Sequence, residues 1–153
     1  MNPQRSWGFR DFVRMRGYSS LYLFSVGSTR PIKVGITDDP LRRLGDFQVA
    51  HYHTVDFLRV WWLPGKPIAS RIESAFKYHF IEEHIRGEWF DVTAEDAIAF
   101  VHDTIERFGT WGISQAEIED RMMRWARKHH DLPKNAPADQ CGLRTMRSRS
   151  WRP

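Results

Sequence analysis

SLYLFSVGSTRPIKVGIT, residues 20–37, is the stretch that decides which fold this chain can adopt. It contains two apolar runs rich in β-forming residues, at 20–26 and 32–37, and residues 27–31 between them are typical of a turn. Two such strands joined by a short turn pair as an antiparallel hairpin. We therefore expect a hairpin here, with the rest of the fold built around it.

The sequence after the hairpin alternates between helix and strand signals. Asp38-Asp39-Pro40 is a typical helix start, and apolar residues at spacings of four mark the buried side of the helix that contains Ile72 and Phe76. The expected elements are a helix at 38–50, a strand at 53–63, a helix at 68–85, a short extended piece at 88–90 and helices at 93–108 and 114–129. This order predicts an α+β fold, with a small antiparallel three-stranded sheet flanked by helices and with added C-terminal helices.

Positive charge is concentrated at the two ends of the chain. We divide the chain into a basic N-terminal segment at 1–18, a domain at 19–110, a C-terminal helix at 111–132 and a basic tail at 133–153 that we expect to be disordered. Basic arms attract phosphate backbones without reading sequence, which favours nucleic acid as a partner. The alternative is that these arms only keep the protein soluble.

Composition excludes several classes of protein. The 153 residues are 41% hydrophobic, enough to bury a core, and no apolar run reaches the length of a membrane span. The single cysteine, Cys141, cannot form an internal disulfide, and the N-terminus lacks the apolar core of a signal peptide. We therefore expect a cytoplasmic protein. The histidines show no zinc spacing, and neither a phosphate-binding loop nor a Ser-His-Asp triad is recognisable.

Glu73 is the first candidate for a chemical role. On a helical wheel it lies at the edge of the apolar stripe, beside the core. A carboxylate at such a position is costly unless it is paired, hydrogen-bonded or bound to a metal. The alternative to a functional role is an ordinary ion pair with Lys77 or Lys66.

Three further positions have both a functional and a structural interpretation. Arg43 lies nearer the core edge of its helix than Arg42, which faces solvent, and a guanidinium fork fits a phosphate; the alternative is a surface arginine. Tyr22 points to the face of its strand opposite Leu21, as a functional or a buried structural tyrosine. Gly35 interrupts the second strand, where glycine marks either a close approach by a ligand or backbone, or a bulge.

Taken together, these pieces resemble the GIY-YIG nuclease superfamily, in the phage-type branch that ends in a Gly-Glu-Trp-Phe motif. Residues 20–22, Ser-Leu-Tyr, stand at the Gly-Ile-Tyr motif, and residues 33–35, Lys-Val-Gly, stand at the Tyr-Ile-Gly motif. Arg43 stands at the helix arginine and Glu73 at the metal-binding glutamate, and residues 87–90 are Gly-Glu-Trp-Phe. The likeness covers about residues 20–92.

The resemblance implies a metal-dependent DNA endonuclease that hydrolyses phosphodiester bonds. Glu73 would hold one divalent cation, Mg²⁺ or Mn²⁺, together with the scissile phosphate. Tyr22 would deprotonate or orient the attacking water, and Arg43 would stabilise charge on the phosphate. Lys33 replaces the second motif tyrosine in the expected active site. A lysine there either binds phosphate or lowers the pKa of Tyr22 by its charge.

Substrate contacts are expected from Gly35, Thr37, Arg42 and Lys77, the last standing where the phage-type branch often has histidine. Glu88 is either a second active-site carboxylate or a structural partner. The expected partner is DNA, in a bacterial cell or a phage-infected host, and the sequence leaves the oligomeric state open.

The sequence is also compatible with other functions. Lys33 favours a catalytically silent DNA-binding module of the same fold. A protein-interaction adaptor would use Trp7, Trp111 and Trp151 as contacts. The helices between 93 and 129 could also hold a helix-turn-helix centred on residues 109–114.

Overall fold

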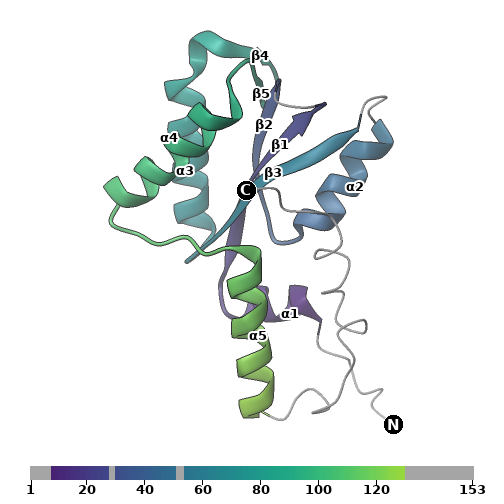
Figure 1. Ribbon diagram of the computed structural model, residues 1–153. Helices are drawn as coiled ribbons and strands as arrows, with labels where there is room; N and C mark the ends of the chain where they lie inside the picture. The colour runs from purple at the N-terminus through teal and green to yellow at the C-terminus, as the bar shows by residue number, and fades with distance from the viewer. Residues whose placement is uncertain (1–7, 28–29, 51–53, 130–153) are drawn as a thin grey trace.

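The expected hairpin forms the centre of the sheet in the computed structural model, which describes residues 8–27, 30–50 and 54–129 (Figure 1). Strand β1 (Ser19–Val26) pairs antiparallel with β2 (Ile32–Thr37), and Tyr22 lies directly opposite Gly35. Strand β3 (Val55–Leu63) pairs antiparallel with the other side of β1. The predicted tail at 133–153 and the first seven residues of the basic N-terminal segment lie outside the described residues.

The α+β class is confirmed, but the sheet has five strands and not three. Strands β4 (His84–Arg86) and β5 (Trp89–Phe90) extend it in the order β3-β1-β2-β5-β4. The helix expected at 68–85 is α3 (Lys66–His79), and a 3-10 turn, η1 (Ile81–Glu83), follows it. Gly87, with a φ of 56°, permits the tight turn between the two extra strands. All three residues of β4 are exposed, so they show no alternation that would have predicted a strand.

Helices α3 and α4 (Ala94–Arg107) cover one face of the sheet (Figure 1). The start of α4 is confirmed by the backbone N–H of Asp96, which donates to the hydroxyl of Thr93 at 3.1 Å. The apolar cluster on this face takes alternate residues of the strands, because successive side chains of a strand point to opposite sides. Its members include Leu21, Leu23, Val34, Leu63, Ile72, Phe76 and Val101.

The other face is covered by α2 (Pro40–Ala50) and by the helices that lie before and after the hairpin region, α1 (Phe9–Met15) and α5 (Gln115–His129). The second apolar cluster joins these helices to the strands, with Phe12, Tyr22, Phe24, Leu44, Trp62, Ile118 and Met122 among its members. No helix in the described part of the chain is long and apolar enough to cross a membrane.

The chain passes around the end of β3 between α4 and α5. A Cβ added to Gly112 would lie only 3.2 Å from Leu63, so the backbone approaches the strand closely here. Ile113 then pairs with Trp62 through two backbone hydrogen bonds of 2.8 and 2.9 Å. The two helices therefore belong to opposite faces of the sheet, and the helix-turn-helix considered around residues 109–114 is wrong.

Candidate functional site

The ring of Tyr22 lies across β2 at the position of Gly35. A Cβ built on Gly35 would fall 2.2 Å from the Tyr22 hydroxyl and 2.4 Å from Cζ. A close approach therefore occurs at this glycine, but the neighbour is a side chain and not the ligand or backbone that was expected. On the side of β2 away from β1, β5 pairs only at Ile32 and Lys33, so no described strand covers that edge from Gly35 to Thr37. The phenol hydroxyl is thus held above β2, next to its open edge.

Glu73 lies on α3 beside the core, as the helical wheel predicted. Its side chain is 14% exposed, and Oε1 is 3.3 Å from Nζ of Lys77. The ion pair with Lys77, which was the structural alternative for this residue, is therefore present. Glu73 is also near Tyr22, because the negative charges of Glu88 and Glu73 both act to raise the pKa of that phenol.

Four charged side chains form a chain from β2 to α3. Nζ of Lys33 donates to Oε2 of Glu88 at 2.6 Å, and Nζ of Lys77 lies 3.4 Å from Oε1 of Glu88. Lys77 also pairs with Glu73, so Glu88 and Lys77 connect the two ends. Lys33 is almost fully buried, and its ammonium lies over the ring of Phe47 at 4.5 Å. A buried ammonium needs such a partner, which makes Glu88 structurally necessary here.

The two lysines beside Glu88 determine the direction in which its pKa shifts. Burial alone would raise the pKa of Glu88, but the hydrogen bond and charge of Lys33, with those of Lys77, outweigh burial and hold the pKa below its usual value. Glu88 is therefore ionised at neutral pH and balances the charge of Lys33.

The pKa of Tyr22 shifts in the opposite direction to that of Glu88. Burial, followed by the negative charge of Glu88, raises the pKa of Tyr22 well above its usual value, and the positive charge of Arg43 does not offset this. The expectation that Lys33 lowers the pKa of Tyr22 is wrong, because Glu88 takes up the lysine charge. A phenol that stays protonated orients a water by hydrogen bonding and is a poor base.

Arg43 and Arg42 are both exposed on the first turn of α2, and neither forms an ion pair within the described residues. Arg43 is the one whose charge reaches Tyr22. Thr37 holds the turn before this helix: its hydroxyl accepts from the backbone N–H of Asp39 at 3.1 Å, and its carbonyl accepts from the hydroxyl of Ser20 at 2.6 Å. Thr37 therefore positions α2 and its arginines relative to the hairpin.

Glu73 and Glu88 are the carboxylates that could hold a cation at this edge. Their Oε1 atoms lie 3.3 and 3.4 Å from the same ammonium, that of Lys77, so two carboxylates from different elements converge on one cationic position. Within the described ranges no cluster of three or more acidic, histidine or cysteine side chains could hold a metal ion. A cation that takes its remaining ligands from water and phosphate can use so few protein oxygens.

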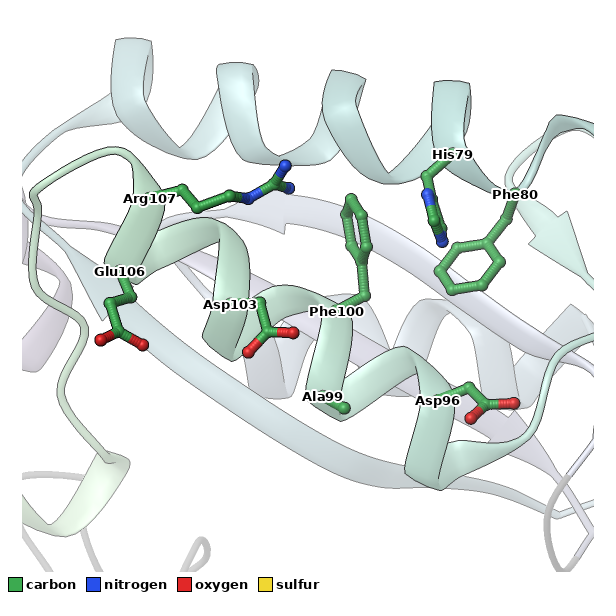
Figure 2. A pocket seen from close by; sticks show the side chains of 8 residues that line it. All are labelled: His79, Phe80, Asp96, Ala99, Phe100, Asp103, Glu106 and Arg107. Carbon is green, nitrogen blue, oxygen red and sulfur yellow. The ribbon is translucent and has the colours of Figure 1, made fainter.

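A separate groove of about 850 Å³ lies along α4 on its side toward the end of α3 (Figure 2). Its floor is aromatic, with His79 stacked on Phe100 at 4.5 Å. Asp96, Asp103 and Glu106 project from α4 along its rim. None of the candidate site residues lines this groove, and its acidic rim opposes the approach of phosphate. It is not part of the site.

The sequence pattern of the T5orf172 domain matches residues 19–106, more than half of the chain. The chain belongs to the T5orf172 domain family. T5orf172 domains are phage-associated and nuclease-like. The T5orf172 match runs from the first residue of β1 almost to the end of α4, and so includes Tyr22, Lys33, Arg43, Glu73 and Glu88. No curated protein and no solved structure matches the chain.

Within the T5orf172 domain, the structure decides one role that the sequence left open. Glu88 joins Lys33 to Lys77, but it lies 55 residues after Lys33, so no local pattern could reveal the pairing. The signal that could have indicated it is the position of Glu88 directly before β5, because β5 is the strand that pairs with Lys33.

Proposed function

We propose that this T5orf172 domain is a metal-dependent DNA endonuclease that hydrolyses phosphodiester bonds, like the GIY-YIG nucleases it resembles. The observation that carries the proposal is the convergence of three elements at the open edge of β2. The Tyr22 hydroxyl comes from β1, the Arg43 charge from α2 and the Glu73 carboxylate from α3. Water, phosphate and cation are the three groups that these side chains suit.

Each side chain has one task in this mechanism. Glu73 would hold one Mg²⁺ or Mn²⁺ with the scissile phosphate, and the bound cation would supply Lewis acidity at the leaving oxygen. Tyr22, which remains protonated, orients the attacking water by hydrogen bonding. Arg43 donates to the non-bridging phosphate oxygens and stabilises the charge that develops on them.

The other predicted residues support these three. Gly35 leaves the space that Tyr22 occupies, and Thr37 fixes the turn that presents Arg43. Lys33 acts through Glu88, since its buried ammonium anchors that carboxylate. Lys77 pairs with both Glu73 and Glu88, and its ammonium would add a positive charge for the phosphate beside the cation. Arg42 adds a further exposed cation for the DNA backbone.

Nicking of supercoiled plasmid tests this proposal. The wild-type protein and Glu73→Gln are incubated with plasmid and either Mg²⁺ or Mn²⁺, with Glu106→Gln as a matched control on the acidic groove. Nicking that depends on the metal, is lost in Glu73→Gln and is kept in Glu106→Gln supports the endonuclease. Equal nicking by wild type and Glu73→Gln would refute it.

The second candidate is a catalytically silent DNA-binding module. Two observations favour it: Glu73 already has a partner in Lys77, and the pKa of Tyr22 is raised. This module predicts that wild type and Glu73→Gln retain DNA equally and in a salt-dependent manner, with no cleavage by either. The adaptor function predicts no salt-dependent retention of DNA at all.

A further inference from the structure

A row of side chains crosses the sheet on the face that carries Tyr22. Phe24, Lys33, Trp89 and Arg86 occupy consecutive cross-strand positions on β1, β2, β5 and β4. Register partners lie on the same face of a sheet, so these four side chains follow one another across it. Helix α2 packs on the first two: the ring of Phe47 lies 5.9 Å from that of Phe24 and 4.5 Å from Nζ of Lys33. The same ammonium lies 5.8 Å from the ring of Trp89, the third member of the row.

A cleft of about 660 Å³ lies at the far end of this row. Trp89, Ile85, Pro31 and Val26 give it apolar walls, and Ile85 is 55% exposed. Lys33 and Glu88 also line it, and both belong to the charged chain that leads to Glu73. The cleft is therefore linked to the candidate catalytic site through Lys33 and Glu88. Its volume lies within the range of pockets that bind small molecules.

The charges around the cleft favour a nucleic-acid strand. Lys33 is neutralised by Glu88, whereas Arg86 is exposed and makes no ion pair within the described part of the chain. The cleft thus combines the aromatic ring of Trp89 with the solvent-facing cation of Arg86. Trp89 lies on the strand next to Lys33, and Arg86 lies one strand further out. Aromatic platforms with neighbouring cations bind single-stranded nucleic acid, because bases stack on the rings and phosphates approach the cations. A paired base is already stacked inside the duplex and cannot enter.

We propose that the cleft binds one unpaired nucleobase of the DNA strand next to the scissile phosphate. The base stacks on Trp89, and Arg86 contacts an adjoining phosphate. The substrate class is then DNA that contains a single-stranded segment, such as a fork or a flap. This inference rests on the proposed function for its choice of DNA as ligand.

Binding measurements test the cleft without relying on cleavage. Full-length wild type, Trp89→Ala and Trp89→Phe are titrated with labelled single-stranded, forked and fully paired DNA of one sequence, in the absence of Mg²⁺ and Mn²⁺. Trp111→Ala is the matched control, since Trp111 is an exposed tryptophan that contacts Tyr18 and Arg121, away from the cleft. Thermal melts verify that each variant is folded.

We expect Trp89→Ala to weaken binding of single-stranded and forked DNA roughly 5- to 150-fold, the effect of losing one stacked base, and to leave duplex binding unchanged. Trp89→Phe retains most of the affinity, and Trp111→Ala all of it. A 2-aminopurine base in the unpaired segment is quenched by wild type and not by Trp89→Ala. Arg86→Ala lowers the salt dependence of single-strand binding by about one phosphate contact. Because Arg86 is exposed, this variant tests the cleft even if Trp89→Ala does not fold.

Three results would overturn the proposal. In the first, Trp89→Ala weakens binding of duplex and unpaired DNA equally. In the second, the 2-aminopurine signal is the same for wild type and variant. In the third, Trp89→Ala converts a dimer to a monomer with DNA affinity intact, which would make the cleft an interface between copies. Failure of the endonuclease proposal is seen separately, in nicking that does not depend on Glu73.

Discussion

Gly35→Ala is expected to lower the free energy of unfolding by about 1–3 kcal/mol, the usual effect of placing an extra methyl group in a filled space. The new Cβ would lie 2.2 Å from the Tyr22 hydroxyl, 2.4 Å from Cζ and 2.9 Å from Cε1, all closer than non-bonded atoms allow. Gly35 is not among the glycines with positive φ, so its backbone suits alanine. The whole penalty therefore comes from Tyr22.

A double-mutant cycle isolates this contact. Tyr22→Leu removes the three atoms that clash and keeps an apolar side chain in the cluster. In that background Gly35→Ala should be neutral or stabilising by about 0.5–1 kcal/mol, because alanine has less freedom in the unfolded chain. Urea unfolding of the four proteins should give a coupling free energy of about 1–4 kcal/mol between the two positions, the difference between the two effects. An equal effect of Gly35→Ala in both backgrounds would refute this account of the glycine.

Two further predictions concern the charges of the site. Because the pKa of Glu88 is held below its ordinary value of 4.5, ionised Glu88 stabilises the folded state above pH 4.5, and this stability is lost as pH falls through the lowered pKa. Urea midpoints measured from pH 6 to 3 should therefore fall less steeply for Glu88→Gln than for wild type, and parallel curves would contradict the prediction. Arg43→Ala should reduce plasmid nicking about 100-fold or more with unchanged thermal stability, because Arg43 is exposed and its proposed role is confined to the phosphate. Arg42→Ala, one residue away, should weaken DNA retention with a much smaller effect on nicking, and equal effects of the two would argue against a special role for Arg43.

Local patterns in the sequence predicted the hairpin and the helices well. Residues 20–37 contain two apolar runs rich in β-forming residues, separated by a turn with glycine and proline, and the apolar spacing on α3 placed Glu73 correctly beside the core. These predictions succeed because the determining contacts lie within a few residues of each other along the chain.

The rest of the site depends on distant contacts. Strand β4 has three exposed residues and exists because β5 pairs with it, so a helix extended to residue 85 was the natural reading of its sequence. Lys33 was expected to act on substrate or on Tyr22, but its charge is neutralised by Glu88, which lies 55 residues later in the sequence. The direction of the Tyr22 pKa shift likewise required the burial that only the packed structure supplies.

The backbone pairing of Ile113 with Trp62 determines how short a working fragment of this protein can be. A fragment cut to the family match would end at residue 106 and lose both hydrogen bonds on the outer side of β3. It would also uncover Trp62, whose indole N–H donates to Gln115 at 2.7 Å, and the apolar residues that face α5. An unpaired strand edge beside an exposed apolar surface promotes self-association. We therefore expect a stable fragment to extend beyond the residues of the family match and to include α1 and α5, which pack on the same face of the sheet.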